Sequence, residues 1–268
     1  MEPGPLPLPP RGRSLRALLE AAGDASLGHF GAGDPRKKAD GSWLTDADLA
    51  AETVLLDTLR VVWPEDTIHS EERGAIPGSP LSRWVVDPLD GTSAFTEGLA
   101  HWGPTIARIV SGPGGDRVEV GGLWLPRLRE HFHYEEGRGW FNGALLRRLD
   151  PTTTPRVIYL PSAFHRHYGV DFVGKARCLG GTAAHLALVA RGSALAALVA
   201  PGWSIWDTAV GLSLIEAVGG RALRLPDRAP LDLFRDTGAA FVAGEAGAVE
   251  ELVSPGRVAP FFKGAGHG

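Results

Sequence analysis

Two stretches near the N-terminus carry apolar residues at helical spacing. The first runs from Arg13 to about Phe30, and the second opens at Thr45 and is ended by Pro64. Leucine and alanine recur in both at the intervals of one buried helix face. Thr45 and Asp48 resemble a capping box with Asp in place of Glu or Gln. We therefore predict two amphipathic helices.

Short apolar runs rich in β-branched and aromatic residues follow, and each predicts a strand. The runs lie at 67–70, 84–86, 105–110, 118–124, 130–134, 157–160, 195–199, 222–225 and 240–243. Gly and Pro clusters separate the runs between 105 and 134, which favours an antiparallel meander. Three later helices are predicted: one that the stretch 178–184 opens and that runs to about Ala190, one after Trp206 and one at 245–253.

One of these runs is followed directly by residues that are candidates for a functional site. The apolar residues 84–86 are followed by Asp87, Asp90, Gly91 and Thr92. Two carboxylates at the end of a buried strand suit a hard divalent cation that a phosphate bridges. Gly91 allows an unusual dihedral or a close approach to a ligand. The alternative is a simple turn with solvated aspartates.

Further acidic residues sit at predicted element ends, and each has a modest explanation by itself. Asp48 caps a helix, and Asp207 complements a helix dipole. Of Glu71 and Glu72, we expect Glu71, which is nearer the strand, to point inward and the other to face water; the alternative is a solvated acidic loop. Together with the aspartates of 87–92, however, these carboxylates would repel one another unless they bound a metal. No histidine pair has ligand spacing, so oxygen coordination of Mg²⁺ or Mn²⁺ is favoured over zinc.

Two segments are candidates for contact with an anion. The small residues of 178–184 lead into a helix whose first amides can meet an anion or a hydroxyl, although a plain glycine turn is the simpler interpretation. Lys37 and Lys38 would screen a phosphate or form a solvated loop.

The composition restricts the function classes. A length of 268 residues with 44% hydrophobic content allows one large domain or two closely packed halves. The net charge of −4 gives no basic surface for a nucleic-acid duplex. The single cysteine, Cys178, excludes an intramolecular disulfide and favours a cytoplasmic location. No apolar run reaches the ~18 residues of a membrane span. Residues 1–12 are predicted to be a flexible, Pro-rich leader.

Several separated motifs resemble one known family. Glu71, the segment Asp87-Pro88-Leu89-Asp90-Gly91-Thr92 and the pair Trp206-Asp207 are similar to signature motifs of the inositol monophosphatase family, whose members are Mg²⁺-dependent, lithium-sensitive phosphatases. The similarity extends from about residue 38 to residue 220. It implies a layered α/β/α/β/α sandwich and a homodimer. It also implies a single phosphatase domain over 13–268, with two closely packed halves that divide near residue 150.

The resemblance also implies a role for each motif residue. Glu71, Asp87 and the carbonyl of Leu89 would hold one metal ion. Asp87, Asp90 and Asp207 would hold a second, and a weaker third would lie near Glu71. Asp48 and Thr92 would activate the attacking water, with Glu71 counted among the catalytic residues. The substrate and its phosphate would contact Gly91, Thr92, Gly181, Thr182 and Ala183.

The expectation for the substrate comes from two positions at which the chain departs from the family pattern. Inositol-specific members carry carboxylates where this chain has Ala196 and Ala200, so we expect a small phosphate monoester other than plain myo-inositol 1-phosphate, with histidinol phosphate as one candidate. Trp102, Trp203 and His101 either line a stacking pocket or pack in the core. The alternatives are a 3′(2′),5′-bisphosphate nucleotidase and a non-catalytic binding protein of the same fold.

Overall fold

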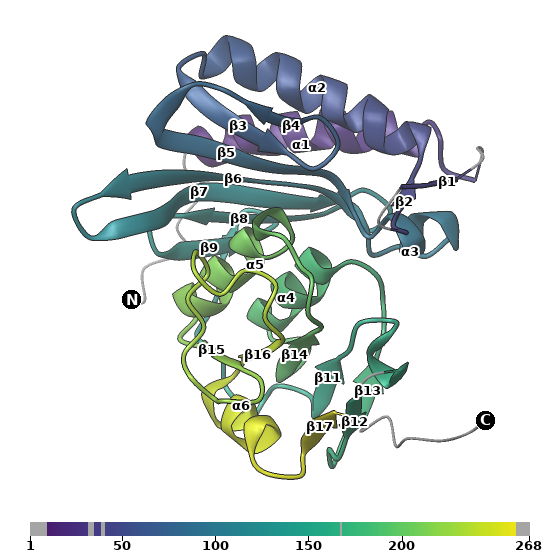
Figure 1. The fold of residues 1–268 in the computed structure, drawn as a ribbon, viewed down its shortest axis with the longest axis vertical. Helices are drawn as coiled ribbons and strands as arrows, with labels where there is room; N and C mark the ends of the chain where they lie inside the picture. Colours follow the sequence, from purple (N-terminus) through teal and green to yellow (C-terminus); the bar gives the residue numbers. More distant parts are fainter. Residues whose placement is uncertain (1–9, 32–34, 39–40, 167, 261–268) are drawn as a thin grey trace.

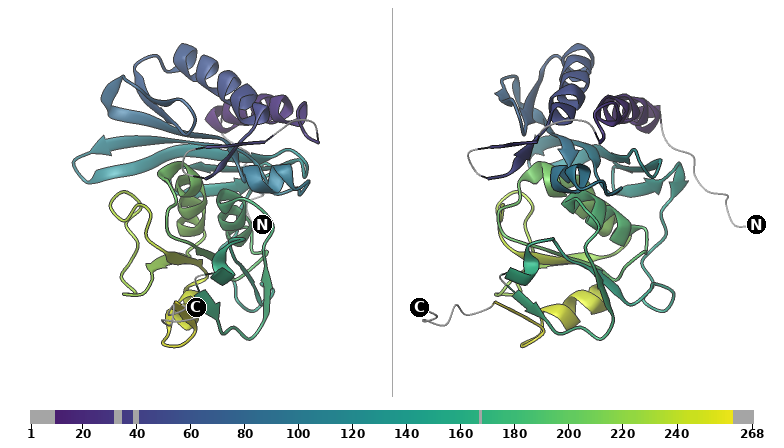
Figure 2. Two further views of the ribbon diagram at one scale, coloured as in Figure 1. Left: turned by 45° about the vertical axis from the view of Figure 1, so that its right-hand side comes forward. Right: turned by 90° about the vertical axis from the view of Figure 1, so that its right-hand side faces the viewer.

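Helices and sheets alternate in five layers (Figure 1). The computed structural model describes residues 10–31, 35–38, 41–166 and 168–260. Helices α1 (Pro10–Leu27) and α2 (Asp46–Val62) cover the first sheet. Helices α4 (Thr182–Ala190) and α5 (Ile205–Ala217) lie between the two sheets, and α6 (Ala246–Val253) covers the far side of the second (Figure 2). The arrangement confirms the α/β/α/β/α sandwich.

The first sheet has eight strands in the order β10-β9-β8-β7-β6-β5-β3-β4. All neighbours are antiparallel except β3 and β5, which confirms the predicted meander. The strands are β3 (Asp66–Ser70), β4 (Gly74–Ile76), β5 (Ser79–Asp90), β6 (Gly103–Gly112), β7 (Gly115–Leu125), β8 (Glu130–Glu135), β9 (Arg138–Phe141) and β10 (Ala144–Leu145).

The second sheet has five strands in the order β13-β11-β14-β16-β15. The first three are parallel, and the last two add antiparallel pairs. They are β11 (Val157–Tyr159), β13 (Lys175–Arg177), β14 (Ala196–Val199), β15 (Arg221–Arg224) and β16 (Phe241–Gly244). Two small sheets pair β1 (Arg36–Lys37) with β2 (Trp43–Leu44) and β12 (Tyr168–Val170) with β17 (Val258–Pro260), and the short helices are α3 (Thr92–Thr96) and η1 (Phe164–Arg166).

Some element boundaries differ from the sequence predictions. β5 does not stop at Asp87 but continues to Asp90, and its pairing with β6 shifts register between these two residues. Pro88 lies inside this shift, where the ladder has no need of its missing N–H. α1 includes residues 10–12 of the expected leader, and residues 1–9 lie outside the described part of the chain. No described helix is both long and apolar enough to cross a membrane.

Side-chain alternation along β5 directs the site toward the middle of the molecule. Trp84 and Val86 pack with α1 and α2, whereas Val85 packs with α4 and α5. Because helices cover both faces of the sheet, the segment is continuously apolar in sequence. Asp87 follows Val85 by two positions and so lies on the same face, toward α5.

Candidate functional site

Three carboxylates from distant parts of the chain meet at the end of β5. Glu71, Asp87 and Asp207 each offer one oxygen, and these oxygens all lie within 4.8 Å of one another. Glu71 directly follows β3, and its amide donates to the carbonyl of Val86 at 3.0 Å. Asp207 lies in the first turn of α5. The structure thus brings together three of the residues that the sequence proposed as metal ligands.

The electrostatics of this group fit a bound cation. Burial raises the pKa of Asp87 well above its usual value, and the charges of Glu71, Asp90 and Asp207 raise it further. Burial, together with the charge of Glu71, raises the pKa of Asp207 to about 7. Carboxylates this close ionise together only when positive charge compensates them. The group contains only oxygen donors, so the residues present fit Mg²⁺ or Mn²⁺.

Asp90 lies beside this group but is held differently. Its carboxylate accepts hydrogen bonds from the amides of Thr182 and Ala183, both at 3.0 Å, at the start of α4. Burial and the charge of Asp207 raise the pKa of Asp90, and the α4 amides oppose them. A Cβ at Gly181 would lie 1.9 Å from an Asp90 carboxylate oxygen, so only glycine fits there. The anion that meets these amides is a side chain of the same protein, and direct substrate contact by Gly181, Thr182 and Ala183 stays a prediction.

One further carboxylate, that of Asp48, lies beside the hydroxyl of Thr92. Thr92 Oγ1 lies within donating distance of Asp48 Oδ1, at 3.1 Å, and of the Leu89 carbonyl, at 3.2 Å. Asp48 Oδ2 accepts from the amide and the hydroxyl of Thr45 at 2.7 and 2.6 Å, so the capping box is confirmed. Asp48 is 1% exposed, and burial raises its pKa against the hydrogen bonds from Thr45 and Thr92.

Gly91 lies in the chain between Asp90 and Thr92. It has a left-handed backbone with φ of 88°, and a Cβ there would lie 2.9 Å from the amide nitrogen of Gly181. The unusual dihedral expected from the sequence is present, whereas the close approach seen here is to the backbone of Gly181, and an approach to a ligand stays a prediction. Gly91 therefore lets the end of β5 pass directly against the turn that leads into α4.

Lys38 and Glu72 contribute more than the sequence indicated. Lys38 Nζ donates to Glu71 Oε1 at 2.7 Å and to Glu72 Oε1 at 2.6 Å. The side chain of Glu72 is 6% exposed and that of Glu71 27%, so the expectation that Glu72 faces water was wrong, and Glu72 is the more buried of the two. Burial raises the pKa of Glu72 to about 7 despite the hydrogen bond from Lys38. Burial alone would lower the pKa of Lys38, but its bonds to Glu71 and Glu72 raise it.

Comparison with known proteins identifies the family to which the chain belongs. The sequence profile described as inositol monophosphatase family matches residues 15–248. The chain belongs to the inositol monophosphatase family. Its relatives include "Nus factor SuhB" of Escherichia coli, 32% identical over 69% of this chain and 72% of that protein. They also include the "Histidinol-phosphatase" of Streptomyces coelicolor, 28% identical over 81% of this chain and 87% of that protein.

Solved structures agree with the family assignment at the level of the fold. The extragenic suppressor protein suhB from Bartonella henselae superposes with a TM-score of 0.79 at 23% identity, over 91% of this chain and 98% of that one. An inositol monophosphatase from Thermotoga maritima gives a TM-score of 0.76 at 24% identity, over 90% and 94% of the two chains. Phosphatases of this family are generally Mg²⁺-dependent, which agrees with the oxygen donors found here.

The packing of two tryptophans and two alanines shows which of them are core residues. Trp102 is fully buried and packs edge-on against Phe95, and Trp203 packs edge-on against Phe241. Both tryptophans are therefore core residues. Ala196 is buried in the core beneath α6, so its side chain faces away from α4 and α5 and reads no substrate. Ala200, after the end of β14, is half-buried, and a role for it in substrate choice stays a prediction.

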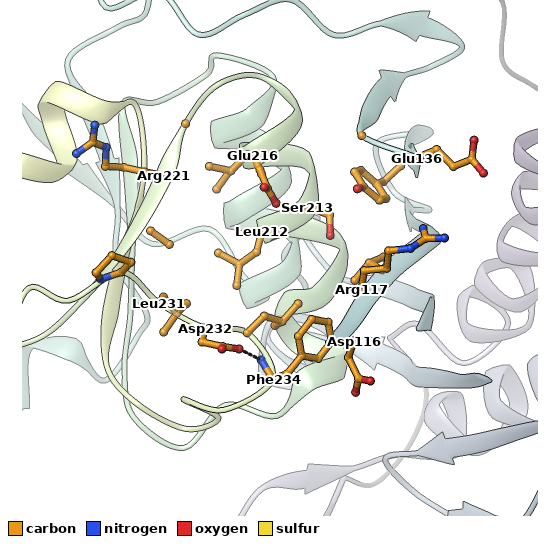
Figure 3. Close-up of a pocket in the computed structure, with 18 residues that line it drawn as sticks. Asp116, Arg117, Glu136, Leu212, Ser213, Glu216, Arg221, Leu231, Asp232 and Phe234 are labelled. Atoms are coloured by element: carbon orange, nitrogen blue, oxygen red, sulfur yellow. Dashed lines mark hydrogen bonds between the residues drawn. The ribbon is translucent and has the colours of Figure 1, made fainter. Parts of the chain in front are cut away.

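A cavity away from these carboxylates is shown in Figure 3. It has a volume of about 860 Å³ and is lined by the C-terminal half of α5, with Leu212 and Glu216, and by the loop that carries Leu231 and Phe234. Asp207 lies at the opposite end of the same helix. Cavity size therefore does not locate the carboxylate cluster, whereas converging charges do.

Proposed function

We propose that this family member is a Mg²⁺-dependent phosphomonoesterase that hydrolyses a small phosphorylated alcohol. The observation that carries the proposal is the convergence of Glu71, Asp87 and Asp207 within 4.8 Å, beside the paired Thr92 and Asp48. When bound, Mg²⁺ would supply the positive charge that stabilises the attacking and leaving oxygens of phosphoryl transfer. Mn²⁺ would substitute for it.

Two or three ions would share these ligands. Glu71, Asp87 and the Leu89 carbonyl would hold the first, and Asp87, Asp90 and Asp207 the second. A third and weaker ion would lie near Glu71. In the described structure Asp90 already orients its carboxylate on the α4 amides, so one of its lone pairs would have to serve a metal in addition.

Asp48 and Thr92 would move the proton. When Thr92 donates its hydroxyl hydrogen to Asp48, its oxygen lone pair can accept a hydrogen from a water molecule. That water is thereby oriented, and Asp48 takes up the proton through the hydroxyl. Burial raises the pKa of Asp48 and makes it a stronger proton acceptor than a solvated aspartate. The amides of Gly91, which precedes α3, and of Thr92, its first residue, would hold the phosphate.

The alcohol part of the substrate is the finer proposal. An alanine at position 200 offers no acceptor for a sugar hydroxyl, so plain myo-inositol 1-phosphate should be a poor substrate. Histidinol phosphate is the first candidate, because the Streptomyces coelicolor histidinol-phosphatase is similar over most of both chains. A homodimer and a cytoplasmic location stay predictions.

Phosphate release from a panel of monoesters tests the proposal. The panel contains histidinol phosphate, inositol 1-phosphate, fructose 1,6-bisphosphate and a nucleotide 3′,5′-bisphosphate, each with and without Mg²⁺. We expect Mg²⁺-dependent release that Asp90→Asn abolishes, with inositol 1-phosphate not the best substrate. No release from any ester would favour a non-catalytic binding protein. Fastest release from the nucleotide 3′,5′-bisphosphate would favour the nucleotidase.

A further inference from the structure

A fully buried glutamate stands behind the metal centre without belonging to it. Glu52 lies on α2, four residues after Asp48, and its side chain has 0% exposure. One carboxylate oxygen accepts a hydrogen bond from the Ser70 hydroxyl at 2.5 Å and from the Arg73 amide at 2.9 Å. The other lies 3.1 Å from Arg73 Nε. Glu52 therefore contacts one short segment of the chain, through two hydrogen bonds to one oxygen and an ion pair to the other, which has no hydrogen-bond partner among the described residues.

That segment is the turn that carries Glu71. Ser70 ends β3, Gly74 begins β4, and the two residues pair across the turn. Glu52 thus binds the residue before Glu71 and the residue after Glu72. On the other side, the Glu71 amide is fixed to the Val86 carbonyl of β5. The backbone of the turn is therefore held from both α2 and β5.

The restraint opposes a repulsion within the site. The charge of Glu71 raises the pKa of both Asp87 and Asp207, so the three carboxylates disfavour one another before a metal binds. A mobile turn would relieve this repulsion by carrying Glu71 away. A turn fixed to α2 keeps Glu71 in place, so the repulsion is offset by positive charge brought to the site, in part by Lys38 and further by a bound cation.

We propose that Glu52 is a positioning residue that preorganises Glu71 for metal binding by fixing the turn of residues 70–73. This inference rests on the proposed function. Because Asp48 and Glu52 lie one helical turn apart on α2, the same helix sets the position of both the proton acceptor and the Glu71 turn. Groups that orient a ligand in this way change metal affinity by roughly 10- to 100-fold when they are removed.

Manganese binding to metal-free protein tests the proposal. Mn²⁺ is titrated into wild type and Glu52→Gln, and free Mn²⁺ is measured by electron paramagnetic resonance. We expect the site that contains Glu71 to weaken by roughly 10-fold or more, while the site of Asp87, Asp90 and Asp207 keeps its affinity. Amide hydrogen exchange at 71–74 should become faster in the variant. With substrate, half-saturation by Mg²⁺ should rise while kcat at saturating Mg²⁺ recovers.

Two further variants make the test independent of folding. Thr53→Val is the matched control, since Thr53 is exposed and contacts the same Arg73 guanidinium at 3.0 Å, and it should bind Mn²⁺ as wild type does. Ser70→Ala removes one bond of the restraint and should shift the Glu71 site in the same direction, even if Glu52→Gln does not fold. Wild-type Mn²⁺ binding in folded Ser70→Ala and Glu52→Gln, or an equal loss at every site, would overturn the inference. Absence of Mn²⁺ binding in wild type would instead overturn the proposed function.

Discussion

Helices α2 and α5 begin with the same local device and use it differently. In α2 the amide of Thr45 donates to Asp48 Oδ2 at 2.7 Å, and in α5 the amide of Ser204 donates to Asp207 Oδ2 at 2.6 Å. Both pairs are capping boxes with Asp at the third helical position. The other oxygen of Asp48 lies against the Thr92 hydroxyl, whereas Asp207 reaches Glu71 and Asp87. The capping box fixes the position of each aspartate at the start of its helix. The residues that the carboxylate contacts elsewhere in the fold determine its chemical role.

Asp207→Asn should have the largest effect. Asparagine can still accept the Ser204 amide, so the cap is kept, but the metal site loses a charged ligand. We expect activity to fall on the order of 10⁴-fold, because a Lewis-acid ion contributes several kcal/mol of transition-state stabilisation. Thermal unfolding should change little. Mn²⁺ titration and phosphate release measure the two losses, and retained Mn²⁺ affinity would show that Asp207 is only a cap.

Asp48→Asn should cost less activity and no metal affinity. The variant keeps an acceptor for Thr45 but loses the proton acceptor behind Thr92. Activity should fall roughly 10²- to 10³-fold, the size of a general-base contribution. The measurement is kcat at saturating Mg²⁺, with Mn²⁺ binding as the control. If Mn²⁺ binding fell as far as in Asp207→Asn, the functional difference between the two caps would disappear.

The cap hydroxyls give the smallest effects. Thr45→Ala and Ser204→Ala should each lower the free energy of unfolding by about 1 kcal/mol, the usual cost of an N-cap. Only Thr45→Ala should also change the pH profile. Its hydroxyl bond favours ionised Asp48, so removing the bond raises the pKa of Asp48.

The sign of that pH effect follows from the role of Asp48. Activity needs the ionised carboxylate and is lost as pH falls through its pKa, so the acid limb should move to higher pH. Profiles of kcat/KM against pH for the two variants measure this. An equal shift in Ser204→Ala would contradict the assignment of Asp48 as the proton acceptor.

The regular part of the fold was readable from sequence because its signals are local. Helices α2 and α5 carry apolar residues at helical spacing between a cap and a Pro or Gly stop. The core of β5 is a β-branched and aromatic run. Its extension to Asp90 depends on pairing with β6, and two-residue strands such as β1 have no periodicity to detect.

The candidate site was readable only in part. Spacing and residue type indicated the acidic cluster, but not what each carboxylate contacts. The α4 amides meet Asp90, a residue 92 positions away from Thr182, and Lys38 meets Glu71 and Glu72. Ala196 shows the same limit, because its place in the chain did not reveal which face of β14 it occupies. Such contacts arise from tertiary packing and leave no local pattern.

The most direct test of the central claim is a crystal structure of the protein with Mn²⁺, measured at the manganese absorption edge. The account predicts anomalous density between the carboxylates of Glu71, Asp87 and Asp207. A well-ordered structure with saturating Mn²⁺ and no anomalous peak among these three side chains would contradict it.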